Sequence, residues 1–138
     1  MNQDLQKNIA ECVGLWLAEG DKKTTAEITF TNNVLDLVLF FKETIEKIYI
    51  GSNKPRLYIY SPSERRLFTQ LDGFKKINFY IDRRANRPYY IYRLADTKFV
   101  REWKEIVKKI TAKKKNFREI LKGLFAGEGN VKFSNNHN

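Results

Sequence analysis

The chain has 138 residues, of which 42% are hydrophobic and 14% aromatic, so it can form a packed core and is not a disordered segment. Its formal net charge of +10 favours a polyanionic partner. The one cysteine, Cys12, excludes a disulfide framework and a CxxC zinc site. No apolar run approaches the ~18 residues of a membrane span, so we expect a cytoplasmic protein with no membrane partner.

The first half of the chain predicts two helices and two strands. Apolar residues from Leu5 to Trp16 recur at helical spacing until Gly20, and the segment "TTAEITFTN" alternates apolar and polar side chains like a half-buried strand. The predicted elements are a helix over residues 4–18, a strand over 24–32, a helix from 33 to about 49 and a strand over 56–61.

The second half predicts a short helix, a hairpin and two longer helices. "SPSE" has the form of a capping box, and "RRANRP" separates two strand-like segments. The predicted elements are a short helix from Pro62 to Gly73, a hairpin of residues 76–84 with 88–94, an amphipathic helix over 97–110 and a final helix over 117–127 that ends at Glu128-Gly129. We therefore expect an α+β fold with a mostly antiparallel sheet packed on helices.

One acidic motif occurs twice, as "GLWLAEGD" from Gly14 and as "KGLFAGEGN" from Lys122. A glycine costs a helix interior roughly 0.5–1 kcal/mol, and close approach of another backbone is the usual reason for it. If the two helices pack face to face, Glu19 and Glu128 emerge side by side at two helix C-termini. That position is unfavourable for acids, and a bound cation would relieve it.

Hard oxygen ligands indicate Mg²⁺ (or Mn²⁺) rather than zinc at these two acids. A divalent ion beside a basic sheet is the arrangement for phosphodiester hydrolysis, with Glu19 and Glu128 as the catalytic residues. The alternative is ordinary helix packing with two unrelated glutamates near solvent.

The positive charge is concentrated in the middle of the chain. Residues 54–93 hold ten Lys/Arg and three Asp/Glu, and residues 98–118 hold nine and two. On the sheet model, Ile28, Phe30, Leu57, Ile59, Ile77, Phe79 and Ile81 pack on the helices. The other face shows Thr25, Glu27, Thr29, Arg56, Tyr58, Tyr60, Lys76, Asn78, Tyr80 and Asp82.

This outward face predicts a nucleic-acid surface. A two-stranded ribbon fits the major groove and can read base edges, while Arg65, Arg66, Arg83, Arg84 and Arg87 are suited to gripping phosphates. The alternatives are cross-strand packing for the tyrosines and a solvated lysine-rich surface.

The segments "VGLWLAEGD" and "LKGLFAGEGN" resemble the two motifs of LAGLIDADG homing endonucleases, and the order of the intervening elements fits one domain of that family. The resemblance implies that the motif helices form a central interface and that the sheet straddles double-stranded DNA. It implies metal binding by Glu19 and Glu128, with the carbonyls of Ala18 and Gly127 as further ligands.

The resemblance also divides the chain. Residues 1–113 would be a LAGLIDADG-type domain, and residues 114–138 the second motif helix with the start of a second domain. Lys113, Lys114 and Lys115 precede that helix, where a basic residue can sit by the cleavage centre. Members often carry Lys or Gln near the attacking water, where this chain has Thr31-Asn32.

The first functional hypothesis is therefore a site-specific DNA endonuclease, or a fragment of one. With one sheet and two motif helices, this form is expected to bind metal and DNA, to cut weakly and to self-associate through its incomplete second half. The alternatives are a non-catalytic DNA- or RNA-binding protein on the same fold, such as a regulator or splicing helper, and a plain structural domain.

Overall fold

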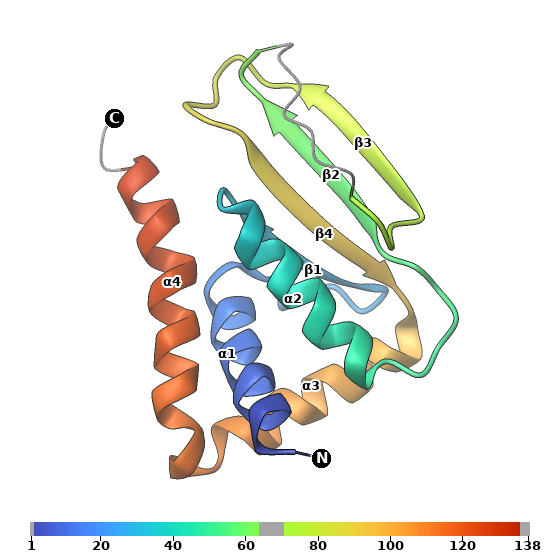
Figure 1. The fold of residues 1–138 in the computed structure, drawn as a ribbon, viewed down its shortest axis with the longest axis vertical. Helices are drawn as coiled ribbons and strands as arrows, with labels where there is room; N and C mark the ends of the chain where they lie inside the picture. The colour runs from blue at the N-terminus through green and yellow to red at the C-terminus, as the bar shows by residue number, and fades with distance from the viewer. Residues whose placement is uncertain (1, 64–70, 136–138) are drawn as a thin grey trace.

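The computed structural model describes the backbone of residues 2–63 and 71–135, and side chains up to Glu128. Its elements are α1 (Gln3–Glu19), β1 (Glu27–Asn32), α2 (Leu35–Ile48), β2 (Arg56–Ser61), β3 (Lys76–Ile81), β4 (Tyr89–Ala95), α3 (Thr97–Thr111), a 3-10 turn η1 (Lys114–Asn116) and α4 (Phe117–Asn135). The class is α+β, as predicted (Figure 1). Within the described ranges, no helix combines the length and apolarity needed to cross a bilayer.

The sheet is mixed, with four strands in the order β1-β4-β2-β3. β4 pairs antiparallel with both β1 and β2, whereas β2 and β3 run parallel. The predicted hairpin of residues 76–84 with 88–94 is therefore wrong, because β2 lies between its two strands. The backbone N–H of Asp82 donates to the carbonyl of Ser61 over 2.8 Å, so the chain stays paired with β2 until it crosses the end of that strand to reach β4.

The helices cover one face of the sheet, over β1 and β4, and α4 lies on the far side of α1 (Figure 1). Phe41 of α2 sits at the centre of the core, where its ring contacts those of Phe30, Tyr92 and Trp103 at centroid distances of 4.8, 5.3 and 5.9 Å. The predicted inward residues Ile28, Phe30, Leu57 and Ile59 are all buried.

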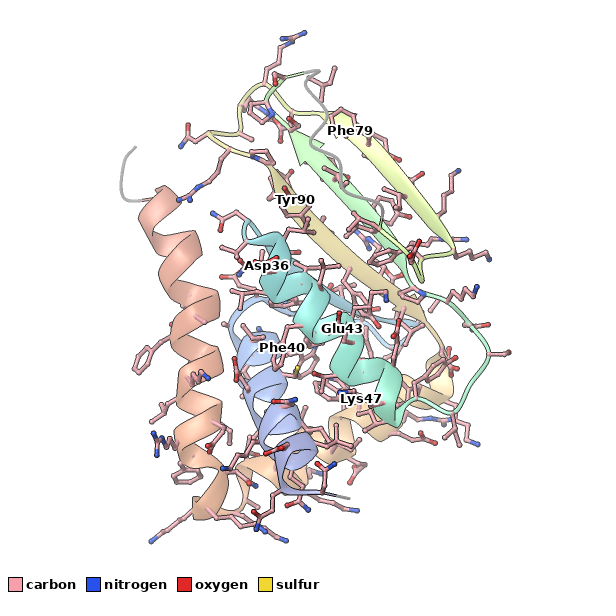
Figure 2. All side chains as sticks on the ribbon, viewed as in Figure 1. Asp36, Phe40, Glu43, Lys47, Phe79 and Tyr90 are labelled. Carbon is pink, nitrogen blue, oxygen red and sulfur yellow. The ribbon has the colours of Figure 1, made fainter. Side chains whose placement is uncertain are left out.

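The edge strand β3 departs from its predicted burial. Its pairing with β2 places Ile77, Phe79 and Ile81 on the inward face, as expected, but Ile77 and Ile81 are 37% and 43% exposed. β3 lies beyond the strands that the helices contact, and Figure 2 shows Phe79 on this outer strand, away from Tyr90 beside α2. The alternation of apolar and polar residues thus predicted correctly which side chains of β3 face inward. Their exposure results from the distance between β3 and the helices.

The helix boundaries follow local capping signals at most positions. The Asn2 side chain accepts from the Leu5 N–H over 2.7 Å at the start of α1, and Asp96 accepts from Phe99 over 3.0 Å at the start of α3. α2 begins after Val34, which makes no side-chain cap. Most of the helix predicted from Pro62 to Gly73 falls on residues 64–70, which lie outside the described part of the chain. At its described ends, residues 62–63 and 71–73 are not helical.

The end of α4 was predicted wrongly, because this helix continues through Glu128 and Gly129 to Asn135. The first motif ends differently: Gly20 adopts an extended backbone and forms a bridge with Phe30 of β1. No strand follows the second motif within residues 71–135, so Gly129 has no such partner to draw the backbone out of the helix. A glycine weakens a helix by about 1 kcal/mol and does not stop it by itself.

Candidate metal centre and nucleic-acid surface

α1 and α4 pack against each other through their glycines, as the repeated motif predicts. A Cβ atom added to Gly14 would collide with the carbonyl oxygen of Ile120, and one added to Gly123 would collide with that of Glu11. Gly123 follows Gly14 by 109 residues, and Ile120 follows Glu11 by the same interval. The two motif helices are therefore related by an approximate two-fold axis. Each of these two glycines contacts the positions of the other helix that are equivalent to those its counterpart contacts.

The same relation pairs Ala18 with Gly127 and Glu19 with Glu128. A Cβ atom on Gly127 would lie 2.9 Å from that of Ala18, so the helices are still in contact where the acids emerge. Burial raises the pKa of the Glu19 carboxyl above its ordinary value, Lys22 opposes this rise, and the negative charge of Glu128 adds to it. The two carboxyl groups thus lie at the same end of the crossing and repel each other.

A concavity of about 430 Å³ opens beside this pair, lined by the end of α1 and by the outward faces of β1 and β4. Glu19 and Lys22 border it on one side, and Thr31 and Arg93 on the other. The Lys22 ammonium donates to the carbonyl of Leu17 over 2.9 Å, which fixes it near the last turn of α1. Sequence reasoning missed Lys22, although it follows Glu19 by only three residues.

The donor set at this end fits a magnesium-like ion. In the described ranges, no three His, Cys, Asp or Glu side chains converge as a ligand group, so Glu19 and Glu128 would act as a pair. Mg²⁺ is commonly held by one or two carboxylates, with water and substrate phosphates completing its shell. The two acids meet that requirement, and their mutual repulsion favours a cation between them.

The two predicted carbonyl ligands differ in their availability. Ala18 lies in the last turn of α1, where a carbonyl group has no N–H partner within the same helix. Gly127 lies inside α4, because that helix continues to Asn135, and an interior carbonyl accepts the N–H four residues later. Only the Ala18 carbonyl is thus placed as the resemblance implies.

The three connector lysines lie far from the acids. Lys113, Lys114 and Lys115 precede α4, and the 11 residue steps from Phe117 to Glu128 extend about 17 Å along the helix. These three lysines therefore do not lie beside the acid pair, whereas Lys22 lies close to Glu19.

The tyrosines of the outward face stack on one another across three strands. Tyr60 stacks on Tyr80 and Tyr89 with ring centroids 5.1 and 4.9 Å apart. Tyr58 stacks on Tyr80 at 6.3 Å and carries the Arg93 guanidinium 5.0 Å above its ring. Cross-strand packing, the alternative reading of these tyrosines, is thus present, and it forms a continuous aromatic surface that Tyr89 extends.

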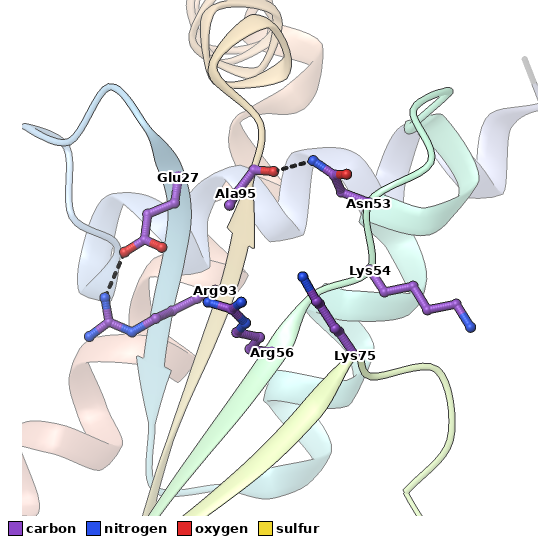
Figure 3. Close-up of a pocket in the computed structure, with 7 residues that line it drawn as sticks. All are labelled: Glu27, Asn53, Lys54, Arg56, Lys75, Arg93 and Ala95. Atoms are coloured by element: carbon purple, nitrogen blue, oxygen red, sulfur yellow. Dashed lines mark hydrogen bonds and ion pairs between the residues drawn. The ribbon is translucent and has the colours of Figure 1, made fainter.

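A small basic pocket of about 110 Å³ lies at the other end of this face (Figure 3). Arg93 donates to Glu27 over 2.7 Å there, while Arg56 and Lys75 project toward the same space (Figure 3). Lys54 adds a further cation to the lining. The pocket therefore carries a net positive charge, because its one carboxylate, that of Glu27, is already paired with Arg93. Such a pocket is suited to one phosphate group.

The remaining predicted contacts have mixed positions. Thr25, Lys76, Arg83, Arg84 and Arg87 are exposed, and Asn78 is half-buried. Arg84 lies 3.6 Å from the Asp82 carboxylate. Thr29 was expected to face solvent but is buried, because its hydroxyl accepts from the Asp21 N–H over 3.1 Å. Arg65 and Arg66 lie outside the described residues.

No protein-family model matches the chain, and the searches of curated proteins and of solved structures give no match either.

Proposed function

We propose that the protein is a divalent-metal-dependent DNA endonuclease of LAGLIDADG type, or the DNA-cutting half of one. The observation that carries this proposal is the pair Glu19 and Glu128, held at equivalent positions of two crossing helices, with Glu19 lining a concavity of the sheet face. The resemblance of both motifs to that family supports the same function.

In this mechanism Glu19 and Glu128 would hold the ion, and Glu19 lines the concavity. When bound, a divalent ion neutralises charge on the scissile phosphate and makes a water more acidic. Lys22 lies beside Glu19, where its ammonium can balance a phosphate oxygen. The Thr31 hydroxyl lines the opposite wall and can orient a water or a phosphate.

The sheet supplies the DNA contacts in this proposal. The stacked tyrosines and Arg93 face the bases, and the basic pocket around Arg56 and Lys75 takes a backbone phosphate. Arg83, Arg84 and Arg87 grip phosphates beyond the end of β3. Duplex DNA is the preferred partner in this proposal, because the sheet of the family that the two motifs resemble straddles duplex DNA.

Metal binding is the first test. Isothermal titration of the chain with Mn²⁺ is expected to show one site, and Glu19→Gln should weaken it by about tenfold or more, since a carboxylate ligand is lost. Glu119→Gln is the matched control, because Glu119 lies on α4 nine residues before Glu128. An unchanged Mn²⁺ affinity in Glu19→Gln would refute the shared site.

Cleavage is the second test, made on a plasmid library with Mg²⁺ or Mn²⁺. Specific nicking is expected to disappear in Glu19→Gln and to persist in Glu119→Gln. Nicking that survives in Glu19→Gln would place the chemistry elsewhere.

DNA affinity should depend steeply on salt. Neutralising each phosphate contact contributes about −0.9 to the slope of log K against log salt, so Arg83→Ala with Arg84→Ala should flatten that slope by about 2. Lys7→Ala with Lys108→Ala is the control, because these two lysines lie on α1 and α3 at the helical end of the molecule. A binding curve indifferent to salt would contradict the basic surface.

A non-catalytic nucleic-acid-binding protein is the second candidate. It is favoured by the continuation of α4 past Glu128, which engages the Gly127 carbonyl, and by Thr31-Asn32 where the family often places Lys or Gln. It predicts salt-sensitive binding of DNA or RNA with no Mn²⁺ site, so the titration above separates the two candidates.

Self-association belongs to the same proposal. Phe117, Leu121 and Phe125 form an exposed apolar stripe along α4, at four-residue spacing that places them on one helix face. By the two-fold relation, this stripe on α4 is equivalent to the side of α1 that faces the sheet. We infer that a second unit bearing a sheet covers it, and sedimentation of the chain over a range of concentrations should show reversible association that Phe125→Glu abolishes.

A further inference from the structure

A groove of about 450 Å³ lies at the helical end of the molecule and has no role in the proposed nuclease. It is formed where α1 begins and where α2 and α3 end, and η1 closes one side. It is separated from the acid pair by the length of α1. This volume is within the roughly 300–1,000 Å³ of ligand-binding pockets.

The floor of this groove is made of four isoleucines from three helices: Ile9, Ile48, Ile106 and Ile110. Ile9 belongs to the buried core, whereas the other three pack against the core while remaining partly exposed. Apolar surface left open in a concave site is available for docking. The floor thus offers room for an apolar side chain.

The rim carries only cationic and amide side chains. Lys47, Lys109, Lys113 and Lys115 surround the floor, with Gln6 and Asn116 between them, and no acidic residue is part of the lining in the described ranges. Lys47, at the end of α2 (Figure 2), and Lys109 stand in last helical turns, where cations offset the helix dipole. Lys113 and Lys115 lie outside any α-helix, so the groove carries positive charge beyond what its helix ends require.

We propose that this groove binds an acidic peptide segment of a partner protein. One large apolar side chain of that segment fills the isoleucine floor, and flanking carboxylates pair with the lysine rim. Charge complementarity selects an acidic partner, and the apolar floor selects a peptide over nucleic acid, whose sugar-phosphate backbone has nothing to bury there. A bilayer surface is too flat to reach a concave floor of this kind.

The test uses a fluorescein-labelled synthetic peptide in which two glutamates stand on each side of a Leu-Phe pair. Fluorescence anisotropy with the full chain at physiological ionic strength is expected to give saturable binding. The double variant Lys113→Glu with Lys115→Glu should weaken it by about tenfold, because two rim charges are reversed. Lys114→Glu is the matched control, since Lys114 stands between them, is exposed and does not line the groove; it should change affinity by about twofold or less.

Three results would overturn the proposal. Equal weakening by Lys114→Glu would mean a diffuse charge effect with no groove. Equal binding of a control peptide with glycines in place of Leu and Phe would remove the role of the isoleucine floor. Loss of duplex DNA binding in the Lys113→Glu/Lys115→Glu variant would assign the rim to nucleic acid, whereas retained DNA binding supports a separate protein-docking site.

Discussion

α1 and α4 carry the same motif in two different surroundings. Trp16 of α1 is 4% exposed and packs edge to face on Trp103, whereas Phe125, its equivalent 109 residues later, is 68% exposed. The shared glycine contacts are nevertheless reciprocal. The motif therefore specifies the helix crossing and the acid pair. The burial of its aromatic residue depends on whether another element packs against the outer face of the helix.

The largest difference between the two helices is expected at the equivalent aromatic positions. Trp16→Ala should cost about 3–5 kcal/mol of unfolding free energy through lost burial and a cavity. Phe125→Ala should stay within about 0.5 kcal/mol at low protein concentration. Urea denaturation of both variants measures this, and equal losses would mean that the outer face of α4 is covered in solution.

Substitutions of the two crossing glycines, Gly14 on α1 and Gly123 on α4, should lower the unfolding free energy by similar amounts. Alanine favours a helix by about 1 kcal/mol over glycine, but at Gly14 or Gly123 its Cβ collides with the partner backbone, so each change should cost about 1–3 kcal/mol net. Gly127→Ala is the milder comparison, because its Cβ lies 2.9 Å from the Ala18 methyl group and 3.6 Å from the nearest backbone atom of α1. A stabilising Gly123→Ala, in the same denaturation assay, would show that the crossing is looser than the structure has it.

The acid pair should destabilise the metal-free fold at neutral pH. A carboxyl whose pKa is raised on folding favours the folded state most when protonated, so its contribution is complete below the unfolded value of 4.5 and declines as pH rises through the raised pKa. Glu19→Gln removes the charge and should stabilise the chain at pH 7 by less than about 1 kcal/mol.

Thermal melts in EDTA at pH 7 and pH 4 measure this effect. The gain from Glu19→Gln should be present at pH 7 and should fade toward pH 4, where the wild-type carboxyl becomes protonated. A variant less stable than the wild type at pH 7 would contradict the repulsion between Glu19 and Glu128.

The smallest effect on the fold is expected from alkylation of a cysteine at another pair of equivalent positions, residue 12 on α1 and residue 121 on α4. Cys12 is fully buried, and burial raises the pKa of its thiol to about 12, so iodoacetamide at pH 8 should leave it unmodified in the native state. Leu121 occupies the matching position on α4 and is exposed. A Leu121→Cys variant should therefore alkylate readily by mass spectrometry, and native labelling of Cys12 would show that α1 opens.

Local patterns were sufficient to predict α1, α2, α3 and the start of α4, and also the faces of the strands. Periodicity located α1 and α3, and alternation placed Ile28 and Phe30 inward. The strand pairing could not be obtained in this way. "RRANRP" reverses the chain whether its flanking strands are adjacent or not, and only the three-dimensional register shows that β2 lies between them.

The site was predictable where its residues share one motif and not where they come from several elements. The repeated Gly and Glu spacing indicated the crossing of α1 and α4 in advance. Lys22, Lys54, Lys75 and Arg93 meet through tertiary packing, and the isoleucine groove is assembled from three helices. Sequence spacing carries no signal for such convergence. The family resemblance, for its part, placed Lys113 to Lys115 too close to the acids.

The separation between the two motifs has a consequence for the order of folding. Contacts between residues 109 positions apart are slow to form, because closing a long loop is entropically costly and such contacts raise the contact order. During synthesis, α1 emerges first, and its glycine face has no partner until residue 127 has left the ribosome. The two carboxylates therefore meet only after the sheet is complete, so a nascent chain carries no assembled acid pair while its sheet is still unformed.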